Sequence, residues 1–102
     1  VVGAGIIGLF IIQLLKVKGC TQIIAVDIDK NRINLALNLG ADVGLMSDVD
    51  MVPKEMYKLT KNLGADVSFE AVGRTETVKI SVNSLKKGGL LVINLWFLCF
   101  KW

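Results

Sequence analysis

The sequence predicts an α/β domain built on a doubly wound parallel sheet. Short apolar runs alternate with longer segments of helical pattern along the chain, and this alternation is typical of β-α-β units. Right-handed crossovers place such strands side by side, so we expect about five strands with helices on both faces. A length of 102 residues allows one domain.

The expected strands are short and apolar, as buried parallel strands are. They cover residues 1–2, 23–26, 43–46, 67–71 and 90–93. The first is only a stump, whereas strands usually run for about five or six residues. We therefore expect an incomplete sheet.

The first two expected helices follow the first two strands. One runs from the turn at residues 3–8 to about residue 18, and its apolar residues lie nearly all round it. A helix of that kind is expected to be buried. The second covers residues 29–39 and ends at Gly40.

Two further helices are expected in the second half of the chain. Pro53 is suited to the first position of a helix over residues 53–63, with Asp50 as a nearby cap. Thr75 is expected to cap a helix that runs to about residue 85. Lysines and glycines at residues 86–89 are expected to end it.

Composition excludes several functions. The chain has 12 Lys+Arg and 9 Asp+Glu, a net charge of +3, and its lysines are dispersed, which disfavours a nucleic-acid partner. The apolar runs at 1–15 and 90–100 are shorter than the roughly 18 residues of a membrane span. No histidine is present, and Cys20 and Cys99 are too few for a four-thiolate zinc site. We expect no catalytic or metal-binding residue here, and two reduced thiols in a cytoplasmic protein.

A glycine motif follows the first strand and opens the first helix. Gly3, Gly5 and Gly8 form G-x-G-x-x-G, and Asp27 ends the next strand 19 residues after Gly8. This context defines a Rossmann-type dinucleotide-binding fingerprint. Gly3 permits the tight turn, Gly5 lets a pyrophosphate approach the backbone, and Gly8 lets the helix pack closely. The alternative is a tight strand–helix turn without a ligand.

Asp27 indicates which dinucleotide is bound. Its carboxylate can accept hydrogen bonds from the adenosine ribose hydroxyls, and its charge repels a 2′-phosphate. NAD is therefore favoured over NADP.

Tyr57 and Lys61 form the spacing Y-x-x-x-K, which is a catalytic pair in short-chain dehydrogenases. They precede the fourth expected strand, where that family does not place its pair. We interpret them as an exposed helix face.

A series of segments in one order resembles a known family. These are Gly3 to Leu9, Ala25 to Asp29, Leu39 to Asp42, Gly64 to Val67, Phe69 to Gly73 and Leu85 to Gly89. The series is similar to the nucleotide-binding domain of zinc-type medium-chain alcohol and polyol dehydrogenases. The similarity extends to about residue 95, and residues 96–102 form an atypical tail.

The resemblance implies further cofactor contacts. Arg32 matches a basic position near the ribose or phosphate, Val72 and Arg74 match positions beside the adenine, and Asn94 matches one near the nicotinamide. Three apolar residues within the matched segments complete the expected set: Ile6, Ile7 and Ile28.

The resemblance also implies a parent enzyme that transfers hydride between an alcohol or polyol and NAD, with zinc polarising the alkoxide. The family's catalytic domain and zinc ligands are absent from residues 1–102, so this single incomplete domain is expected to be inactive alone. Its expected partners are NAD and that catalytic domain, within a homo-oligomeric parent.

Two other functions also use a glycine-rich turn and an acid after the second strand. A non-catalytic dinucleotide-binding module would use the same glycines and Asp27. An S-adenosylmethionine methyltransferase shares the glycine-rich turn and the acid, but the segments at 69–73 and 86–89 fit the dehydrogenase series better.

Overall fold

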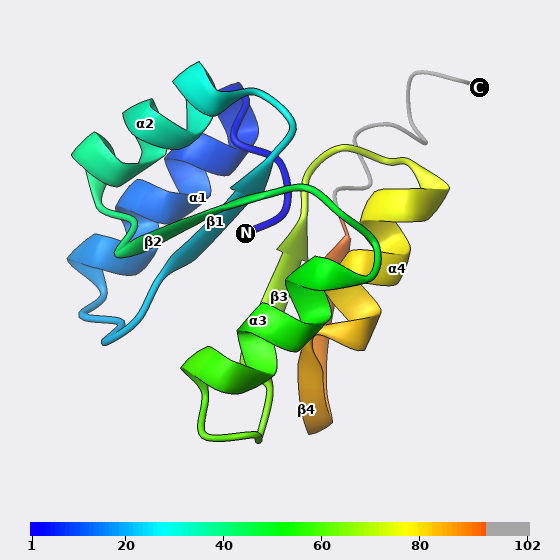
Figure 1. The fold of residues 1–102 in the computed structure, drawn as a ribbon. Coiled ribbons are helices and arrows are strands. Elements are labelled where there is room, and N and C mark those ends of the chain that lie inside the picture. Colours follow the sequence, from blue (N-terminus) through cyan, green and yellow to red (C-terminus); the bar gives the residue numbers. More distant parts are fainter. Residues whose placement is uncertain (94–102) are drawn as a thin grey trace.

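The computed structural model describes residues 1–93, and it arranges them as alternating helices and strands (Figure 1). The elements of this part of the chain, in order, are α1 (Ile6–Val17), β1 (Ile24–Asp27), α2 (Lys30–Leu39), β2 (Val43–Met46), α3 (Met51–Leu59), β3 (Ala65–Glu70), α4 (Thr75–Asn83) and β4 (Leu85–Ile93). None of these helices has the length and apolarity needed to cross a membrane.

The strands are parallel and form two pairs that meet at Val2. β1 pairs with β2 and β3 pairs with β4, while Val2 forms single parallel bridges to Val26 in β1 and to Glu70 in β3. The spatial order is therefore β2, β1, Val2, β3, β4. The expectation of about five strands was wrong for the described residues, because the 1–2 segment supplies only bridging residues and four strands remain.

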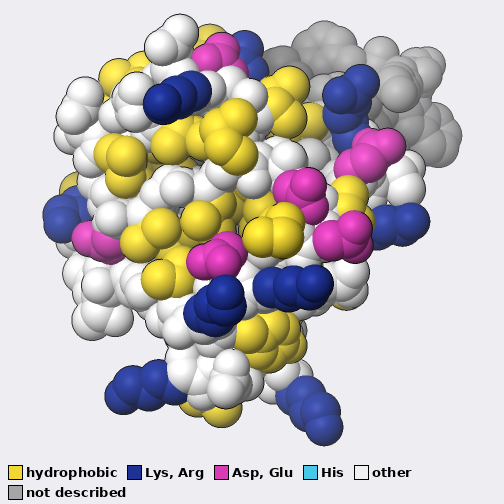
Figure 2. Space-filling view, viewed as in Figure 1, with side chains coloured by type: hydrophobic (Ala, Val, Ile, Leu, Met, Phe, Trp, Pro, Cys, Tyr) yellow, Lys and Arg dark blue, Asp and Glu magenta, His cyan; other side chains and the backbone are white. Residues whose placement is uncertain are grey.

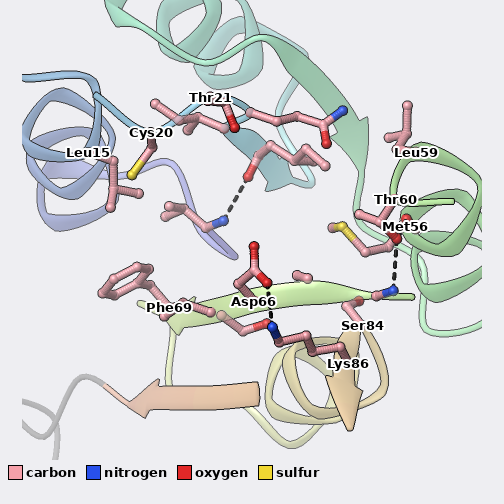
Figure 3. Close-up of a pocket in the computed structure, with 18 of the residues that line it drawn as sticks. Leu15, Cys20, Thr21, Met56, Leu59, Thr60, Asp66, Phe69, Ser84 and Lys86 are labelled. Atoms are coloured by element: carbon pink, nitrogen blue, oxygen red, sulfur yellow. Dashed lines mark hydrogen bonds and ion pairs between the residues drawn. The ribbon is translucent and has the colours of Figure 1, made fainter. Parts of the chain in front are cut away.

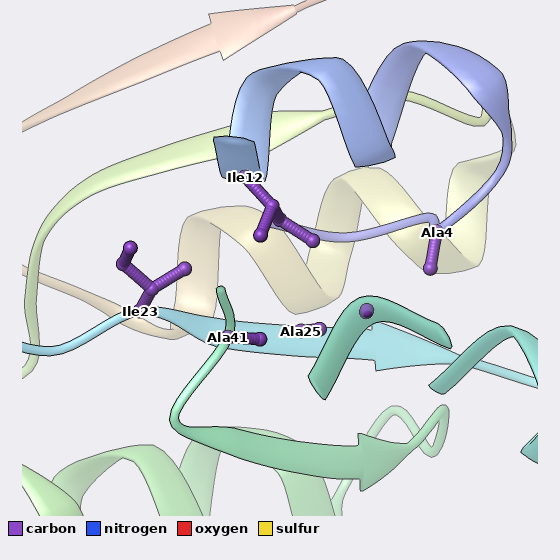
Figure 4. Close-up of a cluster of buried hydrophobic side chains, with 6 residues drawn as sticks. Ala4, Ile12, Ile23, Ala25 and Ala41 are labelled. Carbon is purple, nitrogen blue, oxygen red and sulfur yellow. The ribbon is translucent and has the colours of Figure 1, made fainter. Parts of the chain in front are cut away.

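Two apolar clusters lie on opposite faces of β1. Ala25 belongs to a cluster with Ile12 of α1 and Ala36 of α2; Figure 4 shows Ile12 of α1 pointing toward β1, which carries Ala25. Val26 belongs to a second cluster with Val52 of α3 and Ile80 of α4. Because neighbouring strand residues point to opposite faces, α1 and α2 cover one face and α3 and α4 the other. This is the doubly wound arrangement.

The prediction that α1 is buried all round was wrong. Gly8 and Ile12 are its buried residues, whereas a stripe on the other side is exposed: Ile6, Phe10, Leu14 and Val17. α1 packs on the sheet and on α2, and no described residue covers that stripe. In Figure 2 apolar side chains likewise reach the surface between charged ones.

The observed ends of α2 agree with those predicted from the sequence, whereas the observed ends of α3 differ from the prediction. Asp29 caps α2, its carboxylate accepting a hydrogen bond from the Asn31 N–H at 2.8 Å, and Gly40 follows the last turn. α3 begins at Met51, so Pro53 is its third residue and not its first. Asp50 lies at the N-cap position without a side-chain bond; Asp48 accepts from the Asp50 and Met51 N–H groups instead.

The boundary between α4 and β4 also differs from the expectation. Thr75 is the first residue of α4 and Arg74 is its N-cap, and the helix ends at Asn83. Residues 85–89 do not end a helix but begin β4, because Ala65 pairs with Leu85 and the Ala65 N–H donates to the Ser84 carbonyl at 2.8 Å.

Candidate functional site

The predicted cofactor residues meet at the carboxyl end of β1, beside the point where the strand order reverses. A shallow pocket of about 90 Å³ opens there, and six of the predicted residues line it: Gly3, Asp27, Ile28, Arg32, Val72 and Arg74. Ligands of doubly wound sheets bind at this topological position. The volume holds a ring-sized part of a ligand, since one water occupies about 30 Å³ in the liquid.

Asp27 is the buried anion of the pocket, with 6% of its surface exposed. Its Oδ2 accepts from the Ala4 N–H at 2.8 Å, and its Oδ1 accepts from the Asp29 N–H at 2.8 Å. The first bond fixes the carboxylate against the glycine turn, and the second fixes it against the start of α2. An ionised carboxylate has about four acceptor positions, so both oxygens can accept further bonds from a ligand.

The glycine turn is closely packed at two of its three glycines. Gly3 has a φ of +101°, and a Cβ there would lie 2.6 Å from the Cγ2 of Val72. A Cβ on Gly8 would overlap the carbonyl oxygen of Gly3. Both positions therefore require glycine, for the turn and for the approach of α1.

Gly5 borders open space instead. No atom lies within 4 Å of the position that its Cβ would occupy. Gly5 is also the N-cap of α1, and it makes no side-chain cap bond to the helix. The first N–H groups of a helix have no partner within it, and they attract anions together with the helix dipole. Ile6 and Ile7, the first two helical residues, are also exposed, so the start of α1 is open to solvent.

Glu70 organises the other side of the pocket. It is 1% exposed, and its Oε1 accepts from the N–H groups of Val72 and Gly73, both at 2.8 Å, and from the Thr77 hydroxyl at 2.9 Å. These bonds hold the loop that carries Val72 and Arg74. The set of candidate residues omitted Glu70; an acid directly after a buried apolar run was the signal that could have included it.

The arginines differ from Asp27 in exposure. Arg32, in the first turn of α2, and Arg74, at the start of α4, are both exposed at the rim of the pocket. Their positive charges lie near the entrance, and the carboxylate of Asp27 lies inside. Asn94 falls outside the described residues.

Tyr57 and Lys61 do not form an exposed helix face, which corrects the sequence interpretation. Tyr57 is half-buried, and its hydroxyl donates to the Leu85 carbonyl at 3.1 Å. α3 ends at Leu59, and Lys61 follows in a left-handed conformation with a φ of +54°. The two side chains thus belong to different local structures.

Metal binding finds no support in residues 1–93. Within that stretch no three His, Cys, Asp or Glu side chains lie together as a metal site requires. The described residues therefore do not fit a zinc ion.

A parallel α/β domain with a glycine turn at its switch point is a nucleotide-binding class of fold, and the comparisons with known proteins define the family. The family model described as zinc-binding dehydrogenase matches residues 7–94. This chain belongs to that family.

Individual relatives agree with this assignment. A zinc-type alcohol dehydrogenase-like protein of Escherichia coli is 34% identical over 93 residues, covering 91% of this chain and 27% of the relative. The sorbitol dehydrogenase of Arabidopsis thaliana is 32% identical over 93 residues, covering 87% and 26%. The apo structure of zinc-dependent alcohol dehydrogenase 2 from Streptococcus pneumoniae superposes with a TM-score of 0.86 at 32% identity, covering 90% of this chain and 27% of that one. The chain spans about a quarter of the length of these relatives.

Proposed function

We propose that this chain is the NAD-binding portion of an oxidoreductase that transfers hydride between an alcohol or polyol and NAD. Its family is one of dehydrogenases, and two matched relatives are named for alcohol and for sorbitol. The observation that carries the proposal is the carboxylate of Asp27, buried beside Gly3 at the switch point and fixed by two backbone N–H groups.

Each part of the site has a role in this proposal. The uncapped start of α1 faces the pyrophosphate, because its free N–H groups and the open space at Gly5 admit an anion. Asp27 accepts hydrogen bonds from the ribose hydroxyls. Val72 and Arg74 lie beside the adenine, and Glu70 holds their loop in place. NAD supplies hydride acceptance when bound, and this chain binds and orients it.

The remaining assignments extend this proposal to the longer enzyme. Residues 1–102 form one incomplete dinucleotide-binding domain that is inactive alone. Zinc and the catalytic groups are supplied by a catalytic domain, Asn94 lies near the nicotinamide, and the parent is a cytoplasmic homo-oligomer. If the purified chain reduced NAD with an alcohol as substrate, this separation of cofactor binding from catalysis would be contradicted.

The preference for NAD provides the sharpest test. Arg32 lines the same pocket, and an arginine there can accommodate a 2′-phosphate. Asp27 and Arg32 therefore favour different cofactors, NAD and NADP respectively. We expect NAD to bind at least tenfold more tightly than NADP in calorimetric titrations, because the buried carboxylate repels the extra phosphate. Equal affinities, or tighter NADP, would contradict the ribose role of Asp27.

Two substitutions separate ligand contact from support of the fold. Asp27→Asn should weaken NAD binding about 10- to 100-fold, since hydrogen bonds to a charged group are worth about 1.5–3 kcal/mol. Asp42→Asn is the matched control, because Asp42 also accepts from a backbone N–H, that of Ile23 at 2.7 Å, away from the pocket. Asp42→Asn should leave NAD affinity unchanged. An asparagine at position 27 keeps one acceptor oxygen for two backbone donors, so urea unfolding of the Asp27→Asn variant measures any damage to the fold separately. Full NAD affinity in a folded Asp27→Asn variant would contradict the ribose role.

A non-catalytic dinucleotide-binding module is the second candidate, because every residue of the pocket would serve it equally. It predicts tight NAD binding by the chain and no alcohol-dependent NAD reduction by the longer protein that contains it. Activity of that longer protein would exclude it.

A further inference from the structure

The first turn of α4 contains a buried threonine that borders the proposed NAD pocket. Thr77 is 8% exposed, and it lines the pocket together with Val72 and Arg74. Its Oγ1 accepts from the Arg74 N–H at 3.2 Å. The hydroxyl proton has two acceptors, the Oε1 of Glu70 and the carbonyl of Arg74, both at 2.9 Å. Both backbone polar groups of Arg74 are thus bonded to this one hydroxyl group.

The hydroxyl group of Thr77 is used within the protein. A threonine hydroxyl has one proton to donate, and both of its acceptors here are protein groups. While these bonds persist, Thr77 donates no hydrogen bond to a ligand in the pocket. Thr77 therefore acts on a ligand through the residue that it holds, which is Arg74.

Glu70 connects Thr77 to the rest of the loop after β3. Its Oε1 also accepts from the N–H groups of Val72 and Gly73, whereas its buried Oε2 has no partner within residues 1–93. In that part of the chain, one oxygen atom thus anchors the whole loop. A series of hydrogen bonds runs from this buried oxygen through Thr77 to Arg74, whose side chain is exposed at the rim of the pocket.

We propose that Thr77 is a positioning residue for the adenine half of NAD, a role that rests on the proposed function. Its hydroxyl holds the backbone of Arg74 in the extended conformation, with φ −110° and ψ 154°, from which the arginine side chain lines the pocket. Loss of the hydroxyl releases Arg74 from the buried carboxylate of Glu70. The arginine is then no longer fixed beside the adenine.

The other buried hydroxyl groups along α4 provide a contrast. Ser84, the C-cap of α4, lines a separate cavity of about 840 Å³ (Figure 3), and its buried hydroxyl has no partner in the described part of the chain. Ser81 is 0% exposed, donates to the Thr77 carbonyl at 2.8 Å and borders neither cavity. Of these three hydroxyl groups, that of Thr77 is the one bonded to the loop after β3.

Binding of AMP, the adenylate half of NAD, tests this role by calorimetric titration. Thr77→Val keeps the branched shape of the side chain and removes the hydroxyl. We expect the affinity for AMP to fall at least about fivefold, a size typical of residues that act on a binding site through another residue. Thr77→Ser keeps the hydroxyl, and it should bind AMP as tightly as the unaltered chain.

Ser81→Ala is the matched control, because it also removes one buried hydroxyl group from the same helix. Loss of its hydrogen bond should lower the urea midpoint, as loss of the Thr77 hydroxyl does. The affinity for AMP should nevertheless stay unchanged in the Ser81→Ala variant. A purely structural role of Thr77 predicts instead that the two variants change stability and AMP affinity in parallel.

Two results would overturn the proposal. One is a folded Thr77→Val variant that binds AMP as tightly as the unaltered chain, and the other is an equal loss of affinity in Ser81→Ala. If Thr77→Val does not fold, AMP is added to the isotope-labelled unaltered chain, and the amide signals of Arg74 and Thr77 are required to shift; their absence also overturns it. An unaltered chain that binds neither AMP nor NAD would overturn the proposed function itself, a failure distinct from these.

Discussion

Glu70 shows how one side chain connects the core to the proposed ligand site. Its Oε1 accepts three hydrogen bonds, from Val72, Gly73 and Thr77, while its buried Oε2 has no partner among the described residues. The side chain of Glu70 therefore holds the loop that carries Val72 and Arg74 in place. A change here is expected to affect stability and NAD binding together.

Replacement of Glu70 tests this arrangement. Glu70→Ala removes the acceptor of three donors and leaves them unpaired in a buried place, which should lower the free energy of unfolding by at least about 2 kcal/mol. Glu70→Gln keeps an acceptor at Oε1 and should lose less. Glu76→Gln, at an exposed acid of α4, is the control and should stay within about 0.5 kcal/mol. Urea unfolding measures all three, and a Glu70→Ala variant as stable as the control would contradict the assignment.

Gly5 and Gly8 provide a second test at the scale of single residues. Gly8→Ala places a methyl group on the Gly3 carbonyl, and overpacking of this kind costs about 1–3 kcal/mol. Gly5→Ala meets open space at a φ of −77°, so stability should change by less than about 0.5 kcal/mol. Its methyl group would instead occupy the approach to α1, and NAD binding should weaken at least tenfold. Calorimetry and urea unfolding separate the two effects; a Gly5→Ala variant with full NAD affinity would contradict the phosphate position.

At the scale of elements, the start of α2 links secondary structure to the site. Asp29 caps this helix through the Asn31 N–H, and its own N–H donates to Asp27. Asp29→Ala should lower the free energy of unfolding by about 1 kcal/mol, the usual effect of losing an N-cap side chain. Asp50→Ala is the matched control, since Asp50 makes no cap bond to α3. Equal effects in the two variants, measured by urea unfolding, would show that the Asp29 cap contributes nothing.

The elements also show how far the sequence predicts this structure. The glycine turn, the strand ending at Asp27 and the boundaries of α2 were predicted, because each depends on residues close together in the chain. The start of β4 was not, since Gly88 and Gly89 imply a helix end locally, whereas the pairing of Leu85 with Ala65 draws the segment into the sheet.

The candidate site also has a part that the sequence predicts and a part that it does not. Gly3, Asp27, Arg32 and Arg74 were expected from motif or resemblance, and the fold gathers them at one pocket. Glu70 is not predicted because the sequence does not show the loop conformation that turns the nearby Val72 and Gly73 N–H groups, and the Thr77 hydroxyl, toward its side chain. The exposed stripe of α1 is not predicted either, because the apolar pattern of a helix does not show which elements surround it.

At the scale of the whole molecule, the stability of a polypeptide that begins at Val1 depends on pH through the amino group of that residue. Its folded pKa, about 5, lies below its ordinary value of 8.0, so the unfolded chain binds this proton first as pH falls. Stability should therefore decrease from pH 8 to pH 5, by up to about 4 kcal/mol at 1.36 kcal/mol per pKa unit. The chain has no histidine to titrate in this window.

Urea midpoints between pH 8 and pH 5 measure this dependence. Chain acetylated at Val1 is the control, because it has no amine to protonate and should show a flat profile over the same range. Parallel profiles for the two forms would contradict the burial of this group.

In the proposed function NAD binds along the carboxyl edge of the sheet, between the start of α1 and Asp27. The most direct measurement is a titration of the isotope-labelled chain with NAD, followed through its backbone amide signals. We predict the largest shifts at Ile6, Ile7 and Ile28, with smaller ones at Val72 and Gly73 and none at Cys20, which lies between the end of α1 and the start of β1. Saturating NAD that leaves the α1 and Ile28 amides unmoved, or that moves those of Cys20 and Phe69 instead, would contradict the account.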